Sequence, residues 1–189
     1  MRHIYPVLAA IFAVALVSLV YARAGLPAFV IFASASSIAY VLWLLTTYRR
    51  PADPRRIVPL YLVALVAQVL HTVEEYVSDF PGELAALFGT APLGIDAFVV
   101  GVMGVGAAIW ILTAGGLFYR NPFANYLLWF FDVGPGVINA IAHVSFPFIG
   151  GVSYFPGVIT VILPTIMSIV VIVALIRGYR AAGADADES

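Results

Sequence analysis

Long apolar stretches alternate with short polar connections along this chain. Six stretches are long enough to cross a bilayer as helices, which takes about 20 mostly apolar residues each. They are residues 4–22, 26–47, 57–78, 95–118, 123–147 and 157–176. We expect the first to be retained, because it lacks the basic cluster that precedes the apolar core of a signal peptide. The pattern therefore predicts an all-α polytopic membrane helix bundle.

The composition agrees with a protein that is surrounded by lipid. Of the 189 residues, 63% are hydrophobic and only 10% are charged, whereas a soluble domain is nearer half apolar and a quarter charged. So few charges cannot cover a water-exposed surface, and we expect a multi-pass protein of the cell membrane. The net charge of -1 gives no indication of nucleic-acid binding. Cysteine is absent, which excludes disulfides and thiolate chemistry.

The arginines orient the predicted helices, and the chain has no lysine. Eight of the nine fall on one side of the membrane, namely Arg2, Arg49, Arg50, Arg55, Arg56, Arg120, Arg177 and Arg180. Only Arg23 falls on the other. Basic residues concentrate on the cytoplasmic side of membrane proteins, so we expect both termini in the cytoplasm. We interpret residues 1–180 as one six-helix transmembrane domain and residues 181–189 as an acidic, disordered tail.

Two external connections carry further signals. The longest, about residues 79–94, contains the segment 83–88, which is typical of a short interfacial helix. The last apolar stretch is preceded by Pro156 and Gly157. Proline is well tolerated in a first helical turn, so we expect the sixth helix to begin there. Thr160 would then lie one turn into this helix and face the polar residues described next.

Four polar residues on the third stretch do not belong in lipid. They are Gln68, His71, Glu74 and Glu75. Ionisable groups at membrane depth cost about 2.5–3.5 kcal/mol each on insertion scales. At 100° per residue the four share one face of a helix, about a third of its circumference, and valines occupy the opposite face. We therefore expect the polar face to point into the bundle.

The fifth stretch has a similar polar stripe. Asp132, Asn139 and His143 fall within about 40° of one another around a helix. Gly134-Pro135-Gly136 interrupts the stripe, and we expect a kink or break there. Both stretches run outward, so Asn139 and His143 should lie at the depth of the third-stretch residues. Asp132 should lie nearer the middle of the membrane.

These residues resemble the signature of the HXXEE-motif membrane proteins, a family without an assigned activity. The resemblance covers roughly residues 60–165. It rests on His71-Thr72-Val73-Glu74-Glu75-Tyr76 with Phe80-Pro81, on Asn139 and His143, and on Tyr154-Phe155-Pro156-Gly157 with Thr160. Ser153 stands where the family usually has an arginine. The resemblance supports the choice of site residues and implies no activity.

The leading hypothesis is a metal site. His71 and Glu75, one turn apart, can reach one ion, and His143 can add a third ligand from the facing helix. Imidazole and carboxylate ligands suit zinc or iron, and three protein ligands leave a coordination position open. Glu74, or whichever glutamate is not a ligand, would serve as a base, so the predicted catalytic residues are Glu74, Glu75 and Asn139. This predicts a metal-dependent hydrolase or oxidoreductase acting on a membrane lipid or another apolar small molecule.

Three alternatives stay open. Two neighbouring glutamates beside a histidine favour a metal-free acid–base site of an isomerase, hydratase or cyclase. Intramembrane carboxylates are also typical of transporters and proton relays, in which Asp132 would extend a path inward. A polar network can also simply hold helices together. Gln68, Asp132, Tyr154 and Thr160 are expected to line the site in each case, and assembly into a homo-oligomer stays open.

Overall fold

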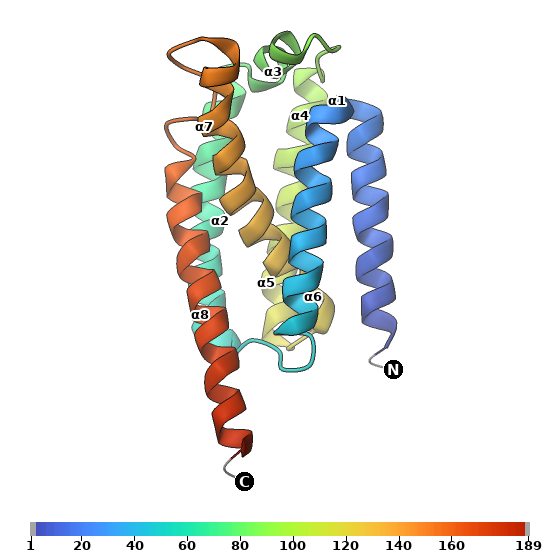
Figure 1. The fold of residues 1–189 in the computed structure, drawn as a ribbon, viewed down its shortest axis with the longest axis vertical. Helices are drawn as coiled ribbons and strands as arrows, with labels where there is room; N and C mark the ends of the chain where they lie inside the picture. The colour runs from blue at the N-terminus through green and yellow to red at the C-terminus, as the bar shows by residue number, and fades with distance from the viewer. Residues whose placement is uncertain (1–2, 188–189) are drawn as a thin grey trace.

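The computed structural model describes residues 3–187, and every regular element in that range is helical (Figure 1). In chain order the elements are α1 (Ile4–Leu45), α2 (Pro54–Val77), α3 (Phe80–Phe88), α4 (Ile95–Phe98), the π-helix η1 (Val99–Gly106), α5 (Ala107–Phe118), α6 (Pro122–Phe131), the π-helix η2 (Asp132–Ile138), α7 (Asn139–Gly150) and α8 (Ile162–Asp187). The prediction of an all-α helical bundle is confirmed.

The first element is folded into two arms. A straight helix of 42 residues would be about 63 Å long, twice the thickness of the hydrocarbon core of a bilayer. Gly25 interrupts it with non-helical angles (φ 75°, ψ -167°), a conformation that glycine accepts without strain. Figure 1 shows the two arms running side by side and meeting in a bend at the upper end of the bundle. The arms match the first two predicted stretches.

The other predicted stretches are also single crossings. Five helices are long and apolar enough to span a membrane. Because α1 is folded into two arms, these five helices correspond to the six predicted stretches. Residues 95–118 and 122–150 each run without interruption. The expected kink or break at Gly134-Pro135-Gly136 takes the form of the continuous π-helix η2. Pro135 has no N–H to donate, and the wider π-helical turn accommodates this loss without ending the helix.

The expected start of the last helix is wrong. Residues 156–161 form turns, and α8 begins only at Ile162. Gly157 has φ +86°, which is incompatible with a right-handed helix. At the other end, α8 stays helical through Asp187, beyond residue 180 where we expected disorder. The many alanines of this segment favour a helix, and residues 188–189 lie outside the described part of the chain.

The core divides the bundle into a lower and an upper half. The lower half is packed with large aromatic side chains that are fully buried, namely Trp43, Tyr61, Tyr126, Trp129 and Phe131. Within it, the Trp129 indole N–H donates to Thr47 Oγ1 at 3.1 Å. The upper half instead contains the polar residues of α2 and α7. On α2 the valine face is exposed, with Val66 at 61% and Val77 at 74%, as expected for a surface in contact with lipid.

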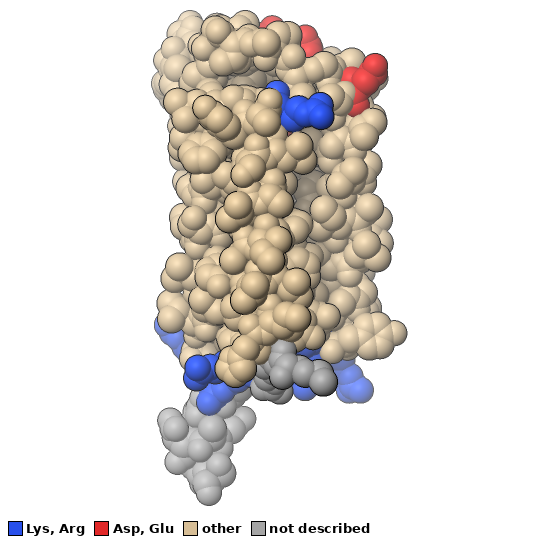
Figure 2. All heavy atoms as spheres, turned by 90° about the vertical axis from the view of Figure 1, so that its right-hand side faces the viewer, with Lys and Arg blue, Asp and Glu red and all other residues tan. Residues whose placement is uncertain are grey.

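The charges separate along the axis of the bundle. Figure 2 shows basic groups gathered at the lower end, while the acidic groups visible in this view lie at the upper end beside one basic group. Both ends of the chain lie at the lower end (Figure 1). α3 lies across the upper end and contains the predicted interfacial segment. Arg2 lies outside the described residues. This distribution agrees with the pattern used to predict cytoplasmic termini, and the side of the membrane stays a prediction.

The folded α1 can be tested by cysteine labelling, since the chain has no cysteine of its own. His3, Ala91 and Ala181 are all exposed and each can carry a single introduced cysteine. In intact cells an impermeant thiol reagent should label Ala91→Cys only. His3→Cys and Ala181→Cys should react only after the membrane is opened. Labelling of His3→Cys from outside would show that α1 crosses the membrane once and would contradict the six-span arrangement.

Candidate metal centre

The upper end of α2 contributes two buried side chains to the site. His71 and Glu75 are one helical turn apart, so both point to the same side of α2. His71 has no exposed surface and Glu75 retains 5%. The Nε2 atom of His71 lies 3.4 Å from Oε1 of Glu75. The polar face of this helix therefore points into the bundle, as its pattern predicted.

Two side chains of α7 meet this pair. His143, fully buried, brings its Nε2 to 3.1 Å from Oε1 of Glu75. Asn139, one turn earlier, places its Nδ2 at 2.9 Å from Nε2 of His71. The two predicted polar stripes therefore meet at one depth. His71, Glu75 and His143 form a group whose potential metal-ligand atoms all lie within 4.8 Å of one another.

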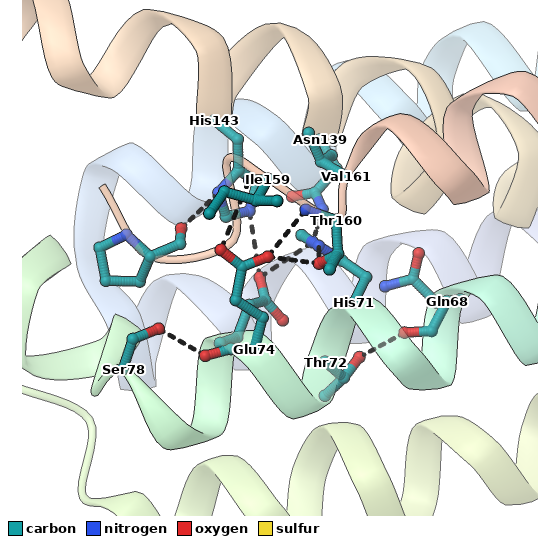
Figure 3. A network of polar contacts seen from close by, with 12 residues as sticks. Gln68, His71, Thr72, Glu74, Ser78, Asn139, His143, Ile159, Thr160 and Val161 are labelled. Atoms are coloured by element: carbon teal, nitrogen blue, oxygen red, sulfur yellow. Dashed lines mark hydrogen bonds and ion pairs between the residues drawn. The ribbon is translucent and has the colours of Figure 1, made fainter. Parts of the chain in front are cut away.

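The connection between α7 and α8 covers the site from outside. It places the backbone carbonyl of Pro156 at 2.8 Å from Nδ1 of His143. It also places Oγ1 of Thr160 at 3.2 Å from Nδ1 of His71. Figure 3 shows Thr160 between His71 and Glu74, with the covering segment crossing over the helices. Thr160 thus faces the site as expected, although it precedes α8.

Glu74 attaches this covering segment to α2. Its carboxylate accepts hydrogen bonds from the Tyr154 hydroxyl at 3.0 Å, from the Ile159 N–H at 3.4 Å and from the Thr160 N–H at 2.8 Å. The Thr160 hydroxyl donates to it as well. Partial burial, together with the neighbouring Glu74 carboxylate, raises the pKa of Tyr154, which therefore donates as a neutral phenol. With four donors on its oxygens, Glu74 is suited to anchoring and less to the role of a base.

These contacts determine which nitrogen carries the hydrogen in a neutral form of each imidazole. A backbone carbonyl can only accept, so His143 must donate from Nδ1 to Pro156. The Thr160 hydroxyl donates its hydrogen to Glu74, so its oxygen accepts from Nδ1–H of His71. In a neutral imidazole the other nitrogen then carries a lone pair. The Nε2 atoms nearest Glu75 then carry the lone pairs, and that of His71 accepts from the Asn139 amide, a hydrogen bond that a metal ion would have to replace.

The electrostatics of the site favour a positive charge between these atoms, which either a bound cation or a proton can supply. Two Nε2 lone pairs and one carboxylate oxygen converge inside a membrane-spanning bundle. Without a positive charge between them these atoms repel one another. Glu74 and Glu75 as carboxylates, with two neutral imidazoles, carry a formal charge of -2. Charges of this kind at membrane depth require compensation.

Gly157 sets how closely the covering segment approaches the two histidines. A Cβ atom at this position would lie 2.4 Å from Cε1 of His143 and 2.9 Å from Cε1 of His71. Its φ of +86° is also one that other residues rarely adopt. Sequence reasoning had assigned this glycine to a helix start. The pair Pro156-Gly157 after a polar stripe was the only signal of its importance.

An aromatic wall lies beside His143. Phe80 of α3 lies 5.0 Å from the His143 ring and Phe146 of α7 lies 5.7 Å away, measured between ring centroids. Phe155 of the covering segment packs on Phe146 at 4.8 Å. Sequence reasoning missed this wall as part of the site. Phe80, which immediately follows α2 in the motif, was the available signal.

Two of the predicted lining residues lie apart from the site. Gln68 is buried on the same face of α2, but its side-chain oxygen has no hydrogen-bond partner within residues 3–187. Asp132 is completely buried, and neither of its carboxylate oxygens is hydrogen-bonded within the described chain. Asp132 begins η2, two helical turns below Asn139. No hydrogen bond or ion pair joins it to the histidines in that part of the chain, so it belongs to a deeper region.

The role of Gly157 can be tested against a matched glycine. Gly151 also has positive φ (+63°), but a Cβ there would meet nothing within 4 Å. We expect Gly151→Ala to cost about 1–2 kcal/mol of unfolding free energy from backbone strain alone. Gly157→Ala should cost about 1–3 kcal/mol more, because its methyl group overpacks against both histidines. Denaturant unfolding in detergent measures both, and equal losses would contradict the close approach.

Comparisons with protein-family models, with curated proteins and with solved structures give no match to this chain. The resemblance to the HXXEE-motif proteins therefore stays a prediction that rests on its motif residues. The functional argument depends on the geometry of the site itself.

Proposed function

We propose that this protein is a membrane-embedded, metal-dependent enzyme whose divalent cation is held by His71, Glu75 and His143. One observation carries the proposal. Both imidazoles donate from Nδ1 to oxygens of the covering segment, and both therefore present Nε2 to the same oxygen of Glu75. Histidines that bind metals in proteins almost always have this second hydrogen bond, which orients the ring and selects the ligating nitrogen.

Two of the three donor-atom distances are close to those around a bound ion, and all three atoms lie within 4.8 Å of one another. A tetrahedral ion with ligands at about 2.0–2.2 Å holds them about 3.3–3.6 Å apart. The Glu75 oxygen lies 3.4 Å and 3.1 Å from the two imidazole nitrogens. Two histidines and one carboxylate are a donor set used by catalytic zinc and by non-haem iron. Such a set leaves at least one coordination position for a reactant.

The remaining polar residues have supporting roles in this proposal. When bound, the cation supplies Lewis-acid chemistry, or redox chemistry if it is iron. Asn139 reaches the inner side of His71 and is the group best placed to hydrogen-bond a reacting atom there. Glu74 acts through Thr160, because it fixes the hydroxyl that accepts from His71. Glu74 is thus a positioning residue and Asn139 a catalytic one.

The surroundings of the site favour an apolar substrate, such as a lipid of the outer leaflet. The site lies in the outer part of the bundle, and Phe80, Phe146 and Phe155 form an aromatic wall beside His143. Glu74 and Tyr154 form a partly exposed polar rim next to the covering segment. A molecule with a polar head and an apolar body would match a polar rim beside an apolar wall.

A metal-free acid–base site is the second candidate, and one observation favours it. The 3.1 Å separation between Glu75 and His143 is also that of a hydrogen bond, so a shared proton can supply the positive charge between them. Such a pair suits proton transfer during isomerisation, hydration or cyclisation. The two candidates make opposite predictions about bound metal.

Metal content distinguishes them directly. Protein purified in detergent without chelator should contain about one equivalent of zinc or iron per chain by elemental analysis, as expected for a site of this donor set. Glu75→Gln keeps the shape of the side chain but removes its charge, and His143→Ala removes one ligand. We expect both variants to lose at least ten-fold in metal content while remaining folded.

Two surface substitutions serve as matched controls. Glu83→Gln removes an exposed carboxylate, and His3→Ala removes an exposed imidazole. Both should retain the metal content of the wild type. A wild-type protein that is folded and free of stoichiometric metal would refute the metal proposal. Activity lost in Glu75→Gln without any change in metal content would instead support the acid–base candidate.

A further inference from the structure

Asp132 is an anomaly in the interior of the bundle. It has no exposed surface and stands between α6 and η2, inside a helix that crosses the membrane. Neither carboxylate oxygen has a hydrogen-bond partner in residues 3–187. Native proteins rarely leave buried polar groups unpaired, and each exception calls for an explanation. An ionised side chain here would be unfavourable for two reasons: a charge at membrane depth raises the free energy, and so does a buried polar group without a hydrogen-bond partner.

A hydroxyl group of α8 faces this carboxyl group. Ser168 is fully buried and lies close enough to Asp132 to interact with its carboxyl group, although the two side chains do not have the geometry of a hydrogen bond within the described chain. Gly136, one turn along η2, allows this approach, because a Cβ there would lie 2.2 Å from Oγ of Ser168. Two unpaired polar side chains thus face each other from η2 and α8. The hydroxyl can donate to a carboxylate or accept from a carboxylic acid, but it carries no charge that could compensate an ionised Asp132.

The other neighbours do not supply a positive charge. Tyr61 of α2 lies near enough to interact electrostatically with Asp132, but its hydroxyl donates to the Trp110 carbonyl at 3.0 Å. On the side of α1, the methyl group of Ala35 packs against Gly134 of η2. The described arginines lie near the ends of the spans, and none forms an ion pair with Asp132 within residues 3–187. A compensating charge must therefore come from something that Asp132 binds.

We propose that Asp132 is an intramembrane proton-binding site, separate from the metal centre, which holds an exchangeable proton and shares it with Ser168. The site binds a proton because the carboxyl group and a single hydroxyl provide too few oxygens for the six or more ligands that larger cations prefer. Its position in η2 is consistent with a functional role, because π-helical turns inside α-helices are frequent at functional sites. The proposal does not depend on the metal centre.

Infrared difference spectroscopy on the folded protein tests the proposal at neutral pH. A neutral carboxylic acid has a carbonyl stretch distinct from the bands of a carboxylate. We expect this band in the wild type, its loss in Asp132→Asn, and its retention in Asp96→Asn, which removes an exposed carboxyl group of α4. Ser168→Ala should shift the band to higher frequency, because it removes the hydrogen-bond partner. Transfer into heavy water should shift the band to lower frequency as the proton exchanges.

Three outcomes would overturn the proposal. A wild-type spectrum without the band would show that Asp132 is ionised. A band that survives Asp132→Asn would belong to another group, and a band unaffected by heavy water would mean that the proton is locked in place. A separate measurement of thermal unfolding tests whether the site binds a metal cation instead. If sodium chloride raises the wild-type unfolding temperature above that in choline chloride, and Asp132→Asn loses this difference, the site binds sodium and the proton assignment is wrong.

Discussion

Two hydrogen bonds from imidazole Nδ1–H groups determine the arrangement of the outer half of this protein. His143 donates to the carbonyl of Pro156, and His71 donates to the hydroxyl of Thr160. Both acceptors belong to the segment between α7 and α8, so this segment is attached to the two helices that it covers. Because the outer nitrogens are used in this way, the inner nitrogens are left to converge on Glu75. Glu74 and Gly157 both serve these two bonds, one by anchoring the segment and the other by allowing its close approach.

The two halves of the bundle are stabilised in different ways. The lower half is a core of interlocked aromatic rings around Trp43, Tyr126 and Trp129, which needs few polar partners. The upper half contains ionisable groups that would be costly in lipid, and nearly all of them are hydrogen-bonded within one network (Figure 3). Asp132 lies apart from both. It is completely buried, and neither carboxylate oxygen is hydrogen-bonded within the described residues, which is why we propose a bound proton there.

Much of this could be predicted from the sequence, because the physics of the bilayer is simple. Helix length and apolar composition placed the spans, and rotation by 100° per residue placed His71, Glu75, Asn139 and His143 on inward faces. Contacts made by irregular backbone could not be predicted in this way. The turn at Gly157, the carbonyl of Pro156 and the late start of α8 depend on positive φ and tertiary packing, which no periodicity records. The anchoring role of Glu74 was missed for the same reason, since its four donors come from the covering segment.

X-ray absorption spectroscopy at the edge of the retained metal tests the central claim most directly, because it reports the ligands as well as the ion. The account predicts nitrogen and oxygen donors at about 2.0–2.2 Å, with outer scattering from two imidazole rings. In His143→Ala any residual signal should show at most one imidazole. A metal without imidazole scattering, or one whose spectrum is unchanged in that variant, would be bound elsewhere and would contradict a centre formed by His71, Glu75 and His143.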